Sequence, residues 1–193
     1  INYYKMKNIA LCFSGGIRYF DSCFPSLYKY FIHPLIQKNN NVDIFLHLTY
    51  IDKIDENIKV KFKMIKSTFD LKILLEKVKP KKYEIYEFNN NIQMNEMKLD
   101  KDYYNYDWGS EKNQNYAFSA FGMYSKINKC NLLRKMYQEE NNIQYDFVWR
   151  GRLDYIFYDY IDFEMIDNAE ENNIYLIKDR YAHNTKKELN DKF

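Results

Sequence analysis

Two short apolar runs near the start of the chain constrain its fold more than any other feature. Residues 8–13 (Asn-Ile-Ala-Leu-Cys-Phe) and 42–48 (Val-Asp-Ile-Phe-Leu-His-Leu) are typical of buried strands. Between them, residues 19–36 carry apolar side chains at helical spacing, and Pro25 is best tolerated in a first turn, which predicts a helix start at Ser22 or Cys23. A strand, a helix and a strand in this order form a βαβ unit, whose parallel strands are joined by a right-handed crossover. The sequence therefore predicts an α/β fold.

The later segments continue this alternation. The lysine-rich residues 58–78 have apolar spacing near 3.6, which predicts one or two amphipathic helices, and residues 113–140 fit one long helix or a helix pair broken near Asn128. Further strands are predicted at 82–88, 145–154, 155–163 and 173–177. We expect a single domain over residues 1–193, with a mostly parallel central sheet flanked by helices, as a segment of a longer protein.

Composition narrows the partners and the compartment. The 193 residues are 46% apolar, enough for one sizeable core, and a net charge of +2 with interspersed signs argues against nucleic-acid binding. Cys12, Cys23 and Cys130 are odd in number and far apart in sequence, which favours reduced thiols and a cytoplasmic location. No apolar run has the length of a signal peptide or a membrane span, so no membrane span is predicted.

A polar cluster follows the predicted strand at 145–154 (Tyr-Asp-Phe-Val-Trp-Arg-Gly-Arg-Leu-Asp). Because side chains alternate along an extended segment, Arg150, Arg152 and Asp154 are expected to project the same way from the strand's carboxyl end. Open α/β sheets bind ligands at this edge, and guanidinium groups suit phosphate oxygens, while a carboxylate beside them suits a divalent metal. The cluster indicates a nucleotide diphosphate site. The alternative is that Arg152 and Asp154 form an ion pair that caps an edge strand.

A second polar segment follows the first predicted strand. Ser14, Gly15, Gly16 and Arg18 lie between this strand and a helix N-terminus, where backbone amides and the helix dipole attract anions. The Ser-Gly-Gly-Ile opening resembles the phosphate loop of ATP-pyrophosphatases, but Arg18 and Tyr19 occupy the places of that family's Asp-Ser. A plain glycine turn with a solvated Arg18 stays open as the alternative.

Four blocks taken together carry a wider resemblance. They are residues 10–18 (Ala-Leu-Cys-Phe-Ser-Gly-Gly-Ile-Arg), 43–47 (Asp-Ile-Phe-Leu-His), 121–127 (Phe-Gly-Met-Tyr-Ser-Lys-Ile) with Cys130 and Leu133, and 145–154. In these blocks the chain resembles a group of glycosyltransferases of large DNA viruses and bacteria. The resemblance implies a single Rossmann-like, GT-A domain that moves a sugar from a nucleotide-sugar donor to a glycan or glycoprotein acceptor, in the host cytoplasm if the protein is viral.

The resemblance also assigns roles to residues. The family's Asp-X-Asp element falls on 152–154, where only Asp154 keeps its carboxylate, so Asp154 is the implied ligand of Mn²⁺ or Mg²⁺. A single carboxylate holds the ion less tightly, and a metal-independent variant in which Arg150 and Arg152 replace part of its charge stays open. Asp191 is the implied catalytic base, with a solvated carboxylate as its alternative, and Lys112 is expected to contribute to donor binding.

Two further expectations complete the sequence analysis. Residues 89–112 show no periodicity but contain Tyr103, Tyr106 and Trp108, which favours a lid or a binding surface. Two other functions stay open beside the glycosyltransferase: a catalytically reduced glycosyltransferase-like binding domain, and an ATP-pyrophosphatase-type enzyme.

Overall fold

A computed structural model of the chain describes residues 6–51, 69–88, 109–161 and 163. The chain divides into two compact units, Ile1–Ile161 and Asp162–Phe193, and the features below belong to the first. Among the described residues, no helix is both long enough and apolar enough to cross a membrane.

The first unit is built on a four-stranded parallel sheet. Its strands are β1 (Asn8–Gly16), β2 (Asn41–Tyr50), β3 (Lys82–Glu87) and β4 (Phe147–Gly151), in the spatial order β3-β2-β1-β4. β1 lies between β2 and β4 in parallel register with both, Phe13 being opposite Leu46 on one side and Gly151 on the other. An α/β fold with a parallel sheet was predicted, and the structure confirms it at this level.

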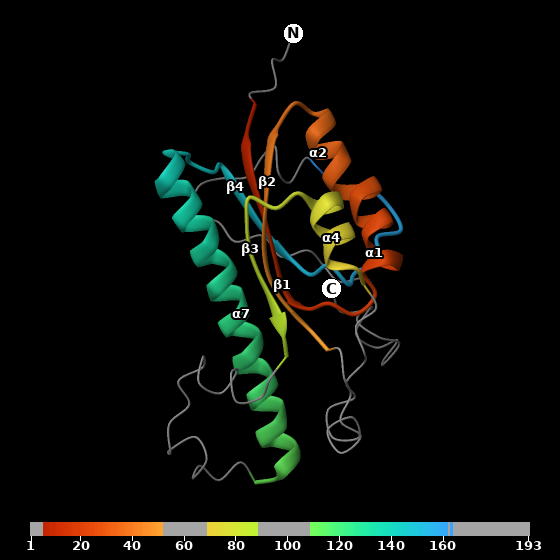
Figure 1. Ribbon diagram of the computed structural model, residues 1–193, viewed down its shortest axis with the longest axis vertical. Helices are drawn as coiled ribbons and strands as arrows, with labels where there is room; N and C mark the ends of the chain where they lie inside the picture. The colour runs from red at the N-terminus through yellow and green to blue at the C-terminus, as the bar shows by residue number, and fades with distance from the viewer. Residues whose placement is uncertain (1–5, 52–68, 89–108, 162, 164–193) are drawn as a thin grey trace, which may run out of the picture. The chain divides into compact units, whose positions relative to one another are not determined.

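Helices cover both faces of the sheet (Figure 1). The long helix α7 (Glu111–Asn141) contacts β1, β2 and β3, whereas the short helices lie on the opposite face. The first of these, α1 (Phe20–Leu27), runs through a π-helical turn, η1 (Tyr28–Ile32), into α2 (His33–Gln37), and α4 (Leu71–Val78) precedes β3. Most residues of the central strands β1 and β2 are buried, as expected for strands of a parallel sheet that lie between helices.

The apolar periodicity explains most of these elements. Leu11, Phe13, Phe45 and Leu46 are completely or almost completely buried, as predicted for central strands. The predicted third strand is β3, and the residues 113–140 form one helix that is continuous through Asn128 rather than a broken pair. α4 occupies the second part of the predicted helical region, whose residues 58–68 lie outside the described part.

Three predictions of local structure were wrong. The first helix begins at Phe20 and contains Pro25 in its interior, because a proline inside a helix removes one backbone hydrogen bond without preventing the flanking turns. β4 ends at Gly151, and residues 152–154 lie outside the strand, with a turn at Leu153 and Asp154. The alternating residues 155–161 form no strand; instead Phe157 stacks against Phe31 of η1, with ring centroids 6.0 Å apart. The predicted strand at 173–177 lies outside the described residues.

Candidate functional site

The candidate site lies where β1 and β4 end side by side. β1 connects through α1 to β2 on one side, whereas β4 lies on its other side, so the strand order reverses between β1 and β4. In open parallel sheets, ligands bind beyond the carboxyl ends of the strands at such a reversal. The two polar segments singled out in the sequence, at 14–18 and 150–154, both occupy this edge.

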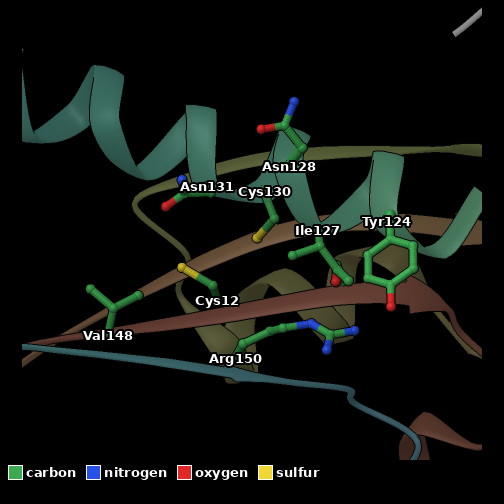
Figure 2. Close-up of a pocket in the computed structure, with 9 residues that line it drawn as sticks. Cys12, Tyr124, Ile127, Asn128, Cys130, Asn131, Val148 and Arg150 are labelled. Atoms are coloured by element: carbon green, nitrogen blue, oxygen red, sulfur yellow. The ribbon is translucent and has the colours of Figure 1, made fainter. Parts of the chain in front are cut away.

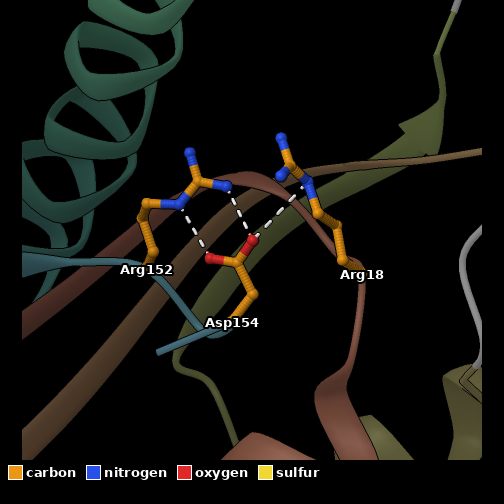
Figure 3. A network of polar contacts seen from close by, with 3 residues as sticks. All are labelled: Arg18, Arg152 and Asp154. Atoms are coloured by element: carbon orange, nitrogen blue, oxygen red, sulfur yellow. Dashed lines mark hydrogen bonds and ion pairs between the residues drawn. The ribbon is translucent and has the colours of Figure 1, made fainter. Parts of the chain in front are cut away.

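Three charged side chains meet there (Figure 3). Arg152 donates from Nε to Oδ1 and from Nη2 to Oδ2 of Asp154, both at 2.7 Å, and Arg18 Nε lies 3.7 Å from the same Oδ2. The Asp154 side chain is only 7% exposed, compared with 51% for Arg18. The hydrogen bond to Asp154 raises the pKa of Arg152, so this guanidinium stays charged. The ion pair that was the alternative reading of Arg152 and Asp154 is therefore present, with Arg18 as a third member.

Gly15 forms the backbone wall of this cluster. Its φ is +123°, a conformation that L side chains rarely adopt, and a Cβ at this position would lie 3.5 Å from Arg152 Nη1. Asp154 uses Nε and Nη2 of Arg152, so the remaining nitrogen, Nη1, is the one that faces Gly15. A Cβ there would make only an ordinary van der Waals contact with the guanidinium, so the positive φ is what favours glycine at this position.

Arg150 belongs to a cavity on the α7 side of the sheet (Figure 2). The cavity has a volume of about 280 Å³, and Arg150 and Ser14 supply polar groups to it together with Asn128 and Asn131 of α7. Tyr124, Ile127, Val148, Cys12 and Cys130 complete its lining. The predicted strand alternation stops at Gly151, so Arg150 lines this cavity while Arg152 leaves the strand and pairs with Asp154.

The sequence analysis did not predict that two of the cysteines lie next to each other in this cavity. Cys12 on β1 and Cys130 on α7 point their sulfur atoms toward each other, although they are far apart in sequence. All three cysteines are free thiols in the structure. Only the strand order and the position of α7 bring Cys12 and Cys130 together, and neither is encoded in cysteine spacing.

Several predicted site residues cannot be placed. Asp191 and the residues 89–108 of the proposed lid lie outside the described part of the chain. Lys112 is in the first turn of α7, where the backbone is described but its side chain is not.

Asp154 does not fit a divalent cation in the arrangement that the structure shows. Both of its oxygens accept from Arg152, Arg18 lies beside it, and two guanidinium groups disfavour a further cation. Within residues 6–51, 69–88, 109–161 and 163, no group of three or more His, Cys, Asp or Glu side chains could hold a metal ion.

Comparisons with protein-family models, with curated proteins and with solved structures gave no match for this chain.

Proposed function

We propose that this chain is a nucleotide-sugar-dependent glycosyltransferase whose donor diphosphate binds at the carboxyl ends of β1 and β4. The observation that supports the proposal most directly is the convergence of Arg18 and Arg152 at the reversal of strand order, beside the glycine backbone of β1. Two guanidinium groups pair with the single carboxylate of Asp154, and Arg150 lines the cavity beside them. This edge therefore has an excess of positive charge suited to phosphate oxygens.

The chemistry of sugar transfer makes such an excess useful. When the bond between the sugar and the diphosphate breaks, negative charge develops on the leaving diphosphate, and fixed cations stabilise that charge. Asp154 holds the guanidinium of Arg152 in a bidentate pair before any ligand arrives, which reduces the reorganisation needed on binding. In this proposal Asp154 positions the arginines, and Arg18, Arg150 and Arg152 contact the diphosphate.

The cavity beside Arg150 suits one further part of the donor. Its volume of about 280 Å³ is at the lower limit of typical ligand pockets, so it would hold one ring of the donor rather than the whole molecule. Hydroxyl and amide groups from Ser14, Asn128 and Asn131 could hydrogen-bond a sugar or a base there.

The test is a thermal-shift panel of UDP-, GDP- and dTDP-sugars, the free diphosphates and ATP, each with and without Mn²⁺. A ligand present at about 100 times its dissociation constant should raise the free energy of unfolding by about 2.7 kcal/mol. A nucleoside diphosphate and its sugar should stabilise the protein without Mn²⁺. Stabilisation by ATP alone would favour the ATP-pyrophosphatase alternative, and stabilisation only with Mn²⁺ would show that the metal is required.

Arginine variants identify the binding edge. Arg152→Lys should weaken nucleotide-sugar binding by about tenfold or more, because an ammonium cannot reproduce the planar, bidentate guanidinium. Lys72→Ala, which removes an exposed cation from α4, is the matched control and should leave binding unchanged. Unchanged affinity in both Arg152→Lys and Arg152→Ala would leave the ion pair with Asp154 as the only role of Arg152. Binding without transfer to any acceptor would favour the catalytically reduced alternative.

A further inference from the structure

A pair of buried thiols joins the central strand to the long helix. Cys12 of β1 and Cys130 of α7 are 5% and 1% exposed, and their sulfur atoms face each other across the cavity (Figure 2). Cys130 Sγ also lies 3.5 Å from the carbonyl oxygens of both Phe13 and Phe45. Its sulfur is thereby fixed at the contact between the sheet and α7.

The two thiols differ in their electrostatic surroundings. A hydrogen bond from Cys130 lowers the pKa of Cys12, burial opposes this shift, and the positive charge of Arg134 adds to it. The same hydrogen bond and burial raise the pKa of Cys130. Cys12 is therefore the thiol that more readily becomes a thiolate, and the thiolate is the nucleophilic form of cysteine.

The cavity gives a small oxidant room beside this pair. Both cysteines line its wall, and its volume of about 280 Å³ far exceeds that of a water-sized molecule such as hydrogen peroxide. The third cysteine, Cys23, lies in α1, on the opposite face of the sheet, and burial raises the pKa of its thiol. The surroundings thus single out Cys12 and Cys130.

We propose that Cys12 and Cys130 form a reversible disulfide when the protein meets hydrogen peroxide. The Cys12 thiolate attacks one peroxide oxygen, the O–O bond breaks, and the departing hydroxide takes up the proton that Cys12 lost, giving water and a sulfenic acid. Cys130 sulfur then attacks the Cys12 sulfur, the S–O bond breaks, and the hydroxide leaves as water with the proton of Cys130. Two thiols lose two electrons in total, and one peroxide molecule gains them. The product covalently ties β1 to α7 at the cavity wall.

The test is peroxide treatment of the folded protein, followed by denaturation in an excess of N-ethylmaleimide. The number of modified cysteines should fall from three to one, with Cys23 still modified, and peptide mass spectrometry should find Cys12 joined to Cys130. Dithiothreitol should restore all three. A non-reducing gel should show a monomer, because the linkage forms within one chain.

Single-cysteine variants distinguish formation of the Cys12–Cys130 disulfide from oxidation of other cysteines. Cys23→Ser should form the Cys12–Cys130 disulfide like the parent, whereas Cys12→Ser should form none. Cys130→Ser should accumulate a sulfenic acid on Cys12 that dimedone traps. Three modified cysteines after peroxide treatment of the parent, or a sulfinic acid on Cys12 with Cys130 still modified, would overturn the proposal. If a variant fails to fold, peptide mass spectrometry of the oxidised parent protein still tests whether Cys12 is joined to Cys130. This result does not depend on the proposed sugar transfer.

Discussion

At the scale of single residues, Gly15 has a backbone conformation that favours glycine at the end of β1, beside Arg152. A residue with φ of +123° is strained unless it is glycine, whereas a Cβ at this position would meet the Arg152 guanidinium at an ordinary contact distance of 3.5 Å. The neighbouring Gly16 does not have a positive φ, and a Cβ there would meet only the Thr49 carbonyl oxygen, at 4.0 Å. Substitution of Gly15 is therefore expected to strain the backbone, whereas substitution of Gly16 is not.

We expect Gly15→Ala to lower the free energy of unfolding by about 1–3 kcal/mol, the usual cost of a residue held in a sparsely populated backbone conformation. It should also weaken nucleotide binding, because relief of the strain moves β1 relative to Arg152. Urea unfolding and the nucleotide titration measure the two effects. Gly16→Ala is the matched control and should change stability by less than about 1 kcal/mol. Equal costs for the two substitutions would contradict the role assigned to the Gly15 conformation.

At the scale of elements, the residues just before β4 are hydrogen-bonded to β1 and β2. Asn8 N donates to Asp146 Oδ2 at 2.8 Å, and Tyr145 donates its hydroxyl proton to Asp43 Oδ2 of β2, also at 2.8 Å. The Tyr145 ring packs edge-on against Phe45, with centroids 6.0 Å apart. Burial and the hydrogen bond to Asp43 raise the pKa of Tyr145 above its ordinary value of about 10.

This shift predicts a pH dependence of stability above pH 10. The folded state keeps the Tyr145 proton where the unfolded state loses it, so the contribution of Tyr145 is fully present below about pH 10 and declines as the pH rises further. Tyr145→Phe should cost about 1 kcal/mol at neutral pH through the lost hydrogen bond, and should lose less stability than the parent between neutral pH and pH 11. Urea unfolding at several pH values tests this. The exposed Tyr83→Phe is the control, and an identical decline in Tyr145→Phe and the parent would contradict the prediction.

The existence of the elements was predictable because it depends on local patterns. The buried runs of β1 and β2 and the helical spacing of α7 are visible in the sequence. The position of Pro25 and the π-helical turn after it were not predicted, because packing of the following helical residues determines how a proline is accommodated. The end of β4 at Gly151 was missed because the alternating pattern continues past it.

The candidate site was predictable as two separate segments. The polar residues at the ends of β1 and β4 point to the carboxyl edge of a sheet, but only the strand order shows that the two strand ends are adjacent. The pairing of Cys12 with Cys130 depends on where α7 crosses the sheet, which also places Cys130 against the carbonyl of Phe13, 117 positions away in the sequence. Such long-range contacts leave no signal in a single sequence.

At the scale of the whole first unit, β1 is central in space but early in the chain. One neighbour, β2, follows it closely, whereas the Asn8–Asp146 contact beside β4 joins residues 138 positions apart. Every other described strand and helix lies between β1 and β4 in the sequence and is therefore synthesised after β1 and before β4. During synthesis on a ribosome, one edge of β1 therefore has no native partner until β4 has emerged, and an unpaired strand edge favours association with other chains.

The same order makes docking of β4 a late event in refolding. Pairing across so long a separation has a loop-closure cost of about 4 kcal/mol, so we expect helical circular dichroism to recover first and β4 to join last. Trp149 of β4 reports this step, because its ring lies 4.7 Å from that of Phe31 in the folded state. Stopped-flow fluorescence of a Trp108→Phe variant isolates the Trp149 signal. A Trp149 change as fast as the earliest circular dichroism phase would show that β1 and β4 meet at the start, and a lag would measure the interval in which one edge of β1 stays open.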